Sequence, residues 1–471
     1  MLKESVMKRK FIPFILLVST IFFVSSCLGD DNEEIVFSDQ VGITAFSLGT
    51  QKIIRDTVSK KGADSTYQTT LDCSKYIFYI DQTKHEIYNP DSLPVGIDCK
   101  KIICSVTSKG SSVTLVKNID SDTLQAFETI DSMDFSKPRT LRMVSMSGRA
   151  SCDYTVKVNI HKQKPNIFEW KIATGCPDMG LLTGMRALAM GGKVYVVGRD
   201  DSQLRIYAAE EQHVVSWTEI TPNVELGADS YKDMTVMGGK LYAHAEDGVY
   251  CSTDAYTWTR VGTPAISRLL GGSNKRLYAL STDNKIVASA DGATWTAEKM
   301  DTPADSLPTG NVSMTARPIL TNPGTDRVVM VGTGDKTSKV WSKVEETDEG
   351  SEQQAWTYMD VAGDNRFRLP NLANLQMTYY DDFMMALGGS GIGNSQGATA
   401  YGGCYTSSDG GMTWRIRKLY ALPTNFNIES NRFAFTADSQ NYLWLIDGKG
   451  NLWRGRLNRL GWAKNKTYFG E

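Results

Sequence analysis

A tryptophan opens a short β-type segment again and again in the second part of the chain, and this repeat restricts the fold more than any other feature. These tryptophans are Trp170, Trp217, Trp258, Trp295, Trp356 and Trp414. They are separated by 47, 41, 37, 61 and 58 residues. The shorter spacings match one four-stranded blade of a β-propeller, and the two longer ones leave room for loops. The repeat therefore predicts a propeller over residues 166–471.

A second landmark supports the same repeat, because a glycine turn precedes a strand-like segment in several units. Residues 191–196 read Gly-Gly-Lys-Val-Tyr-Val, and residues 238–243 read Gly-Gly-Lys-Leu-Tyr-Ala. Such turns between alternating apolar and polar residues are typical of antiparallel sheets. Counting the units that end at Trp217 through Trp462 predicts six blades, with seven as the alternative. Trp170 then lies on an N-terminal strand that closes the ring against the last blade, unless Trp462 fills that place.

Three of these units share a short turn immediately before the tryptophan. The shared positions are Ser252, Asp254 and Trp258 in the first copy, Ser289, Asp291, Gly292 and Trp295 in the second, and Ser407, Asp409, Gly411 and Trp414 in the third. The motif resembles the Asp-box hairpin, in which the aspartate accepts backbone N–H groups of the turn and glycine permits a positive φ. We therefore expect these residues to be structural, with each tryptophan packed between neighbouring blades.

Residues 36–164 differ from the repeat region and predict a small all-β domain. The segment 76–80 is rich in β-branched and aromatic residues. Residues 154–160 alternate apolar and polar side chains, which predicts a strand with one buried face, paired with residues 140–144. The region resembles the immunoglobulin-like domains of Bacteroides-type lipoproteins, so we predict a sandwich. The lysine-proline segment 162–165 marks the boundary with the propeller.

Residues 1–26 have the form of an export signal. The basic residues Lys8–Lys10 precede a mostly apolar stretch over residues 11–24, which is short for a membrane span of roughly 20 residues. This stretch ends in Val24-Ser25-Ser26-Cys27, which resembles the bacterial lipobox, so we expect cleavage before Cys27 and a lipid on that cysteine. The acidic segment 27–35 resembles the tether that directs Bacteroides-type lipoproteins to the surface. We predict an outer-membrane lipoprotein at the cell surface, with a periplasm-facing anchor as the alternative.

The composition argues against several classes of function. The chain of 471 residues carries 51 basic and 53 acidic side chains, a net charge of −2, which argues against a nucleic-acid partner. Its histidines and cysteines do not fall at zinc-ligand spacings, so we expect no metal. No phosphate loop, dinucleotide fingerprint or G-x-S-x-G elbow is present. We predict neither a cofactor nor a catalytic residue.

Four residues in or beside the long insertions are candidates for a ligand surface, namely Arg368, Tyr379, Tyr380 and Tyr401. Residues 367–370 read Phe-Arg-Leu-Pro, which matches an arginine motif of sialidases. The sialidase motif lies near the start of the propeller, whereas this one lies between the fourth and fifth units. We interpret the match as a coincidence, and the tyrosines and the arginine as possible sugar contacts.

The order of the parts resembles that of functionally uncharacterised Bacteroides-type lipoproteins with an immunoglobulin-like domain and a propeller. The resemblance covers nearly the whole chain, but it implies export and fold rather than a reaction. We expect a membrane-anchored, non-catalytic binding module for a glycan or another surface protein. Two alternatives are a glycoside-acting enzyme with an atypical site and an assembly factor for a protein complex.

Overall fold

The structure is a computed structural model that describes residues 37–458, apart from residues 61, 111, 213, 360–364, 399–403 and 427–430. The chain divides into two compact units, with the boundary between Lys164 and Pro165. Cys27 lies outside the described residues together with the predicted signal and the whole of the tether, and so does Tyr401. Within the described part of the chain, no helix has the length and hydrophobicity that a bilayer span requires.

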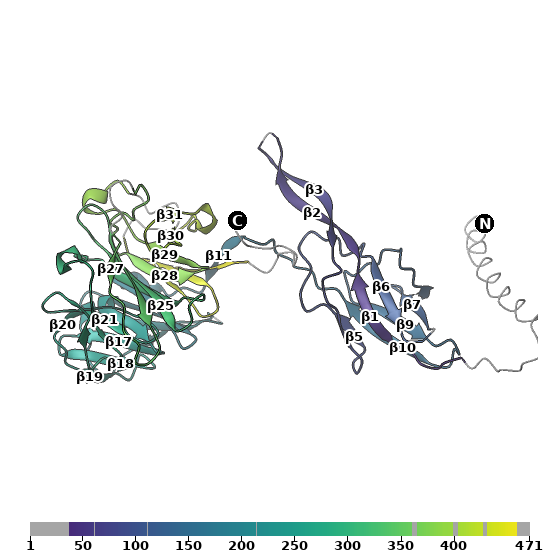
Figure 1. Ribbon diagram of the computed structural model, residues 1–471, viewed down its shortest axis with the longest axis horizontal. Helices are drawn as coiled ribbons and strands as arrows, with labels where there is room; N and C mark the ends of the chain where they lie inside the picture. The colour runs from purple at the N-terminus through teal and green to yellow at the C-terminus, as the bar shows by residue number, and fades with distance from the viewer. Residues whose placement is uncertain are drawn as a thin grey trace, which may run out of the picture. The chain divides into compact units, whose positions relative to one another are not determined.

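The first unit is built on a six-stranded sheet (Figure 1). Its strands, in spatial order, are β4 (Tyr79–Asp81), β5 (Glu86–Tyr88), β10 (Ser151–Lys157), β9 (Arg139–Val144), β7 (Val113–Lys117) and β8 (Leu124–Ala126). β10 runs antiparallel to β9, which confirms the predicted hairpin of β9 and β10. On its other side β10 runs parallel to β5. β10 ends earlier than predicted because the backbone N–H of Asn159 donates instead to the Asn89 side chain, at 2.7 Å.

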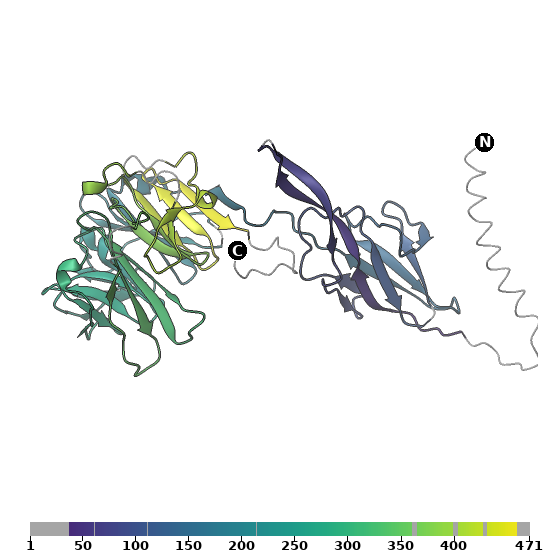
Figure 2. The same cartoon turned by 45° about the horizontal axis from the view of Figure 1, so that its top comes forward.

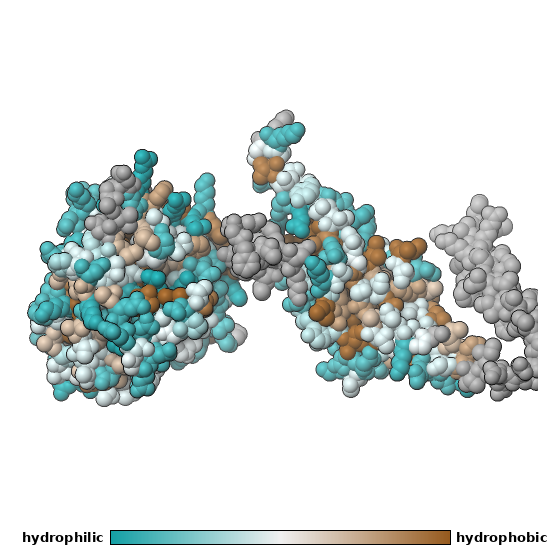
Figure 3. All heavy atoms as spheres, viewed as in Figure 1, coloured by the Kyte–Doolittle hydropathy of each residue, from teal (hydrophilic) through white to brown (hydrophobic). Residues whose placement is uncertain are grey.

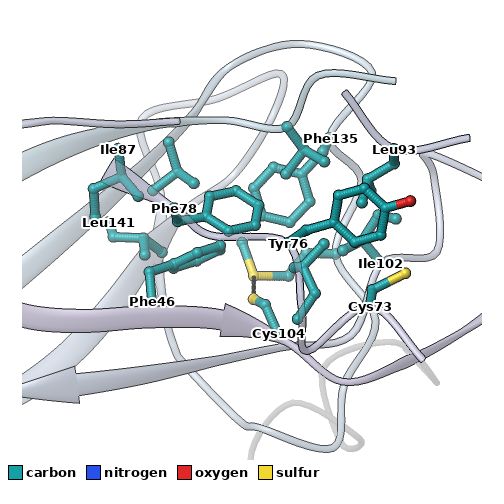
Figure 4. Packing of buried hydrophobic residues seen from close by; sticks show 14 of the residues in the cluster. Phe46, Cys73, Tyr76, Phe78, Ile87, Leu93, Ile102, Cys104, Phe135 and Leu141 are labelled. Carbon is teal, nitrogen blue, oxygen red and sulfur yellow. Dashed lines mark hydrogen bonds between the residues drawn. The ribbon is translucent and has the colours of Figure 1, made fainter. Parts of the chain in front are cut away.

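A second, two-stranded layer completes the core of this unit. Strand β1 (Ile43–Leu48) pairs antiparallel with β6 (Cys104–Ser108). Phe46 of β1 and Cys104 of β6 belong to the same buried cluster as Ile87 and Leu141 of the larger sheet (Figure 4). Within β10, Tyr154 and the other apolar residues are buried while their polar neighbours are exposed, as the period-two pattern predicted. The unit is therefore a two-layered β structure, and its immunoglobulin-like character stays a prediction.

A separate hairpin extends from this unit (Figures 1 and 2). It consists of β2 (Thr50–Val58) and β3 (Asp64–Asp72), which pair antiparallel along their whole length. Ile53 and Leu71 at its base are buried, whereas Val58 and Tyr67 farther out are exposed. Only the base of the hairpin is therefore held by the hydrophobic core.

The second unit contains, in the described residues, six antiparallel sheets of four strands each (Figures 1 and 2). From the innermost strand outward, the first three are β12 (Gly184–Met190), β13 (Lys193–Arg199), β14 (Leu204–Glu210) and β15 (Thr218–Ile220); β16 (Met234–Met237), β17 (Lys240–Ala245), β18 (Gly248–Ser252) and β19 (Thr259–Gly262); and β20 (Ile266–Gly272), β21 (Leu277–Ser281), β22 (Ile286–Ser289) and β23 (Thr296–Ala297). The other three are β24 (Ser313–Pro318), β25 (Thr325–Gly332), β26 (Lys339–Glu346) and β27 (Thr357–Tyr358); β28 (Gln376–Tyr380), β29 (Phe383–Leu387), β30 (Tyr405–Ser407) and β31 (Arg415–Ile416); and β32 (Phe433–Ala437), β33 (Leu443–Asp447), β34 (Leu452–Leu457) and β11 (Phe168–Ala173).

The sheets form a closed ring. The inner strands contact one another in the cycle β12, β16, β20, β24, β28, β32 and back to β12. Short 3-10 helices lie in the connections, namely η1 (Pro177–Leu181), η2 (Ala228–Asp233), η3 (Ala304–Ser306), η4 (Gly393–Ser395) and η5 (Lys418–Tyr420). The N-terminal strand β11 is the outer strand of the last sheet, where Trp170 pairs with Gly455 of β34. The all-β class is confirmed, and the ring is closed by the Trp170 strand as the sequence predicted.

Buried charged side chains lie between the sheet of β20–β23 and the sheet of β24–β27. Glu345 is completely buried, and it accepts hydrogen bonds from Ser273 Oγ at 2.8 Å and Tyr278 OH at 2.5 Å. Lys343, also buried, pairs with Glu298. Burial raises the pKa of the Glu345 carboxyl above its ordinary value, although the two hydroxyl donors oppose this.

Candidate functional site

The turn around Asp291, between β22 and β23, shows how the three repeated turns are built. Gly292 N–H donates to Ser289 Oγ at 2.8 Å, and Ser289 Oγ donates to Asp291 Oδ1 at 2.9 Å. The same aspartate oxygen accepts Thr294 N–H at 2.8 Å. Gly292 has a φ of 81°, and Trp295 Nε1 donates to its carbonyl at 2.9 Å. Backbone hydrogen bonds hold the pKa of Asp291 below its ordinary value, because they favour the ionised carboxylate.

The turn around Asp254 has the same bonds without the glycine. Ser252 Oγ donates to Asp254 Oδ1 at 3.0 Å and accepts Ala255 N–H at 2.9 Å. Ala255 takes the glycine position with a φ of 64°. Trp258 is buried, and its Nε1 donates to the Ala255 carbonyl at 2.7 Å. The hydrogen-bond pattern therefore imposes the left-handed conformation even on a residue that has a Cβ.

The turn around Asp409 completes the set. Ser407 Oγ donates to Asp409 Oδ1 at 2.8 Å, and Trp414 Nε1 donates to the Gly411 carbonyl at 2.9 Å. Trp414 packs in a core cluster drawn from its own sheet and from the preceding one, and Trp258 does the same between the first two sheets. The aspartates serve the turns, and these two tryptophans join neighbouring sheets.

Arg368, a candidate from the sequence, lines a pocket of about 190 Å³. The pocket lies between the sheet of β24–β27 and the sheet of β28–β31, and Asp335, Lys339 and Asn365 supply polar groups to it. Phe367 is 43% exposed, and the guanidinium of Arg415 lies 4.1 Å from the centre of its ring. The Phe-Arg-Leu-Pro segment thus belongs to a connection between two sheets at a polar pocket.

The two tyrosines predicted beside Arg368 lie elsewhere. Tyr379 is partly buried on β28, with the guanidinium of Arg317 4.1 Å from the centre of its ring, and burial raises the pKa of Tyr379 to about 12. Tyr380 is only 2% exposed, and its hydroxyl accepts Leu457 N–H at 2.8 Å. The expectation that Tyr380 contacts a ligand is therefore corrected: strand alternation turns its side chain into the core, against the last sheet.

Charged side chains that the sequence reasoning missed meet where the inner strands begin. Arg186 is the third residue of β12 and Arg268 the third residue of β20, and Asp233 immediately precedes β16. Arg186 Nη1 donates to the Lys232 carbonyl and Nη2 to the Val312 carbonyl, both at 3.0 Å. Val312 precedes β24, which lies three strands away from β12 around the ring. The Arg186 side chain therefore reaches across the axis of the ring.

Asp233 is the carboxylate of this group. Its Oδ1 lies 3.4 Å from Arg268 Nη2, and its Oδ2 lies 3.8 Å from His244 Nδ1. Burial lowers the pKa of Arg186 to about 10, with a further contribution from the positive charge of Arg268. We call Arg186, Asp233, His244 and Arg268 the axial cluster.

The axial cluster has the chemistry of a site for an anion. Guanidinium groups present several N–H donors in a plane, which suits carboxylate and phosphate oxygens. General acid–base hydrolysis of a glycoside uses two carboxyl groups, whereas Asp233 is the single carboxylate of this cluster. Among the described residues, no group of three or more His, Cys, Asp or Glu side chains is arranged to hold a metal ion.

One sequence signal could have pointed to this cluster. An arginine stands at the third position of two inner strands, β12 and β20. The repeat gives these two arginines equivalent positions, and the closed ring brings them together. Only the three-dimensional structure shows that Asp233 and His244 join them.

The fold defines a β-propeller protein with an additional N-terminal β domain. The chain belongs to the DUF6242 family: residues 164–465 match the DUF6242 β-propeller domain, and residues 46–158 match the N-terminal domain of unknown function of the same family. No curated protein matches the chain.

Solved structures resemble the chain only distantly. The WD40 domain of coronin from Toxoplasma gondii is 10% identical, with a TM-score of 0.35 over 65% of this chain and 90% of that one. A gluconolactonase from Xanthomonas campestris is 12% identical, with a TM-score of 0.33 over 62% and 95%. BamB from Moraxella catarrhalis is 11% identical, with a TM-score of 0.24 over 92% and 97%.

Proposed function

We propose that this protein is a non-catalytic binding module for a glycan, held at the outer membrane by a lipid on Cys27 and presented at the cell surface. The observation that carries the binding role is the axial cluster, in which polar side chains from different sheets converge where the inner strands begin. A ring closed by its own N-terminal strand holds those sheets in fixed positions. Such a pre-organised polar site favours binding.

A glycan is favoured over a protein partner by the character of the surface. On the face drawn in Figure 3, the described residues of the propeller mix hydrophilic and hydrophobic side chains, and the hydrophobic ones form only small groups. A stable protein interface usually has a larger apolar core. The polar pocket beside Arg368 offers a second surface for a sugar.

The glycoside-acting alternative has one observation in its favour, because paired arginines can also orient the acidic group of a substrate. Asp233 would then have to act as acid or base while arginine and histidine groups lie next to it. Hydrolysis of a glycoside ordinarily uses two carboxyl groups, whereas the axial cluster supplies only that of Asp233. Binding without turnover is therefore the better account of the geometry.

The test combines a glycan array with a turnover assay on fluorogenic glycosides, both with the full chain in detergent. We expect binding to a subset of glycans and no turnover. Turnover that disappears in Arg368→Ala would overturn the non-catalytic assignment and the interpretation of residues 367–370 as a coincidence. Failure to bind any glycan would refute the glycan ligand and favour a protein partner.

The anchor is tested separately in cells with Cys27→Ala. We expect incorporation of a labelled fatty acid in the parent chain and none in the variant, and a surface-applied protease should digest the anchored parent in intact cells. Labelling that persists in Cys27→Ala would refute the lipid site. Labelled protein that resists the protease in intact cells would instead favour an anchor that faces the periplasm.

A further inference from the structure

The axial cluster has hydrogen-bonding capacity that the described residues do not use. Arg268 Nε is shielded from solvent and has no hydrogen-bond partner among the described residues. The Arg268 side chain as a whole is 27% exposed, so part of it remains accessible. Buried donors without an acceptor are rare in folded proteins, and each one calls for an explanation.

The charges of the cluster are also unbalanced. Arg186 and Arg268 contribute two positive charges and Asp233 one negative charge, while Arg186 itself uses two backbone carbonyls and no carboxylate within the described part of the chain. Just outside, Lys232 and Arg199 share the single carboxylate of Asp229, at 2.8 and 3.2 Å. Both groups therefore carry a surplus of one positive charge, which attracts an anion toward the axis.

We infer that Arg268 binds the carboxylate of an acidic sugar at the axis of the ring, with the positive charge of Arg186 beside it. The inference rests on the proposed function and narrows it from glycans in general to glycans with a carboxylate group. Arg268 makes the direct contact, and Arg186, fixed by the carbonyls of Lys232 and Val312, supplies a charge that cannot swing away. Asp233 orients Arg268 from the other side.

The cluster suits a carboxylate better than a phosphate dianion. A carboxylate brings one negative charge next to Asp233 and a phosphate dianion brings two, so the carboxylate is repelled less by Asp233. The planar fork of a guanidinium also matches the two oxygens of a carboxylate. Glucuronic acid and N-acetylneuraminic acid present such a carboxylate, whereas glucose is the matched neutral sugar for glucuronic acid.

The test is a calorimetric titration of the full chain in detergent with glucuronic acid, N-acetylneuraminic acid and glucose, at low ionic strength and again at physiological salt. We expect binding of at least one acidic sugar, weakened by salt, and none of glucose. Arg268→Met keeps the aliphatic stem and should weaken that binding about tenfold or more. Arg260→Met is the matched control, because Arg260 is an exposed arginine paired with Asp247 on an outer strand, and it should leave binding unchanged.

Two results would overturn the inference: equal binding of glucuronic acid and glucose, or acidic-sugar binding that Arg268→Met does not weaken. Arg186→Met is a poorer probe, because Arg186 also links opposite sides of the ring, so its folding must be checked by circular dichroism. If the protein binds neutral glycans on the array and Arg268→Met binds them equally well, this inference is refuted while the proposed function stands. If the unmodified protein binds no glycan at all, both this inference and the proposed function are refuted.

Discussion

Glu345 lies with its full side chain buried between two sheets, and its position has a consequence for stability. Its two hydroxyl partners, Ser273 and Tyr278, donate to the carboxyl oxygens and so favour the ionised form. Burial nevertheless favours the neutral form. The propeller thus holds this proton more tightly than the unfolded chain does.

We predict that Glu345→Gln removes a pH dependence from the propeller. Because the pKa of Glu345 is raised in the fold from an ordinary value of 4.5, the free energy of unfolding should fall as pH rises from that value to the folded pKa. Glutamine keeps the shape and the acceptor oxygen, so the variant should gain relative to the parent as pH rises. Denaturant unfolding over a pH series measures this, with the exposed Glu225→Gln as control. A difference between variant and parent that stays constant with pH would contradict the prediction.

We predict opposite effects at the two equivalent turn positions 255 and 292. Ala255 pays for a positive φ, so Ala255→Gly should stabilise the protein by up to about 1 kcal/mol after the larger chain entropy of glycine is subtracted. A Cβ at Gly292 would lie 2.9 Å from Val261 Cγ2, so Gly292→Ala should destabilise by about 1–3 kcal/mol. Chemical denaturation of both variants gives the two values. The same sign for both would show that the turns are not equivalent.

At the scale of the element, β11 is the strand on which closure of the ring depends. Phe168 packs edge to face against Trp170, Tyr380 and Tyr420, so the strand is held by aromatic contacts as well as by its ladder with β34. Ile172 on the same strand is 74% exposed. Phe168 and Ile172 are therefore a packed position and an exposed control position on the same strand.

We predict that Phe168→Ala lowers the free energy of unfolding by about 2–4 kcal/mol, because a partly buried aromatic side chain is removed from the closing contact. Ile172→Ala should stay within about 0.5 kcal/mol of the parent, since little of its surface is buried. Urea unfolding followed by tryptophan fluorescence compares the two. Equal effects would mean that the aromatic cluster does not stabilise the closure.

The elements show where sequence reasoning succeeds and where it fails. Repeated tryptophans and glycine turns predicted the strands of the propeller, because each repeat must present the same apolar residues to its neighbours. Tyr380 was misjudged because Tyr379 and Tyr380 are adjacent and only the strand register decides which one is buried. The axial cluster was missed because Arg186, Asp233 and Arg268 are distant in sequence and lie in or directly before strands of three different sheets, so they meet only when those sheets pack together.

At the scale of the whole molecule, the two units have separate hydrophobic cores. The core around Leu141 belongs to the first unit, and the core around Leu445 belongs to the propeller. The sequence marked the change at its lysine-proline segment, and the structure divides the chain at Lys164. The arrangement of β5, β10 and the β2–β3 hairpin could not be predicted, because pairing between non-consecutive strands leaves no periodic signal.

We predict that the full chain unfolds in two transitions in differential scanning calorimetry. Leu141→Ala and Leu445→Ala each remove a completely buried side chain, at a cost of about 2–5 kcal/mol. Each variant should lower the midpoint of one transition and leave the other unchanged. A single transition that both variants shift would show that the two units unfold together.

The pairing of β11 with β34 also sets the timing of assembly. Phe168 and Leu457 are partners although 289 residues separate them, so the last sheet cannot form until the chain has been synthesised as far as β34. Bringing such distant segments together has an entropic cost, which the pairing of β11 with β34 must offset when it forms. A ribosome that stalls before codon 452, or a nonsense mutation there, leaves β11 without its partner. The truncated protein would then have an open ring of sheets, not a closed ring with fewer residues, and would be a substrate for quality-control proteases.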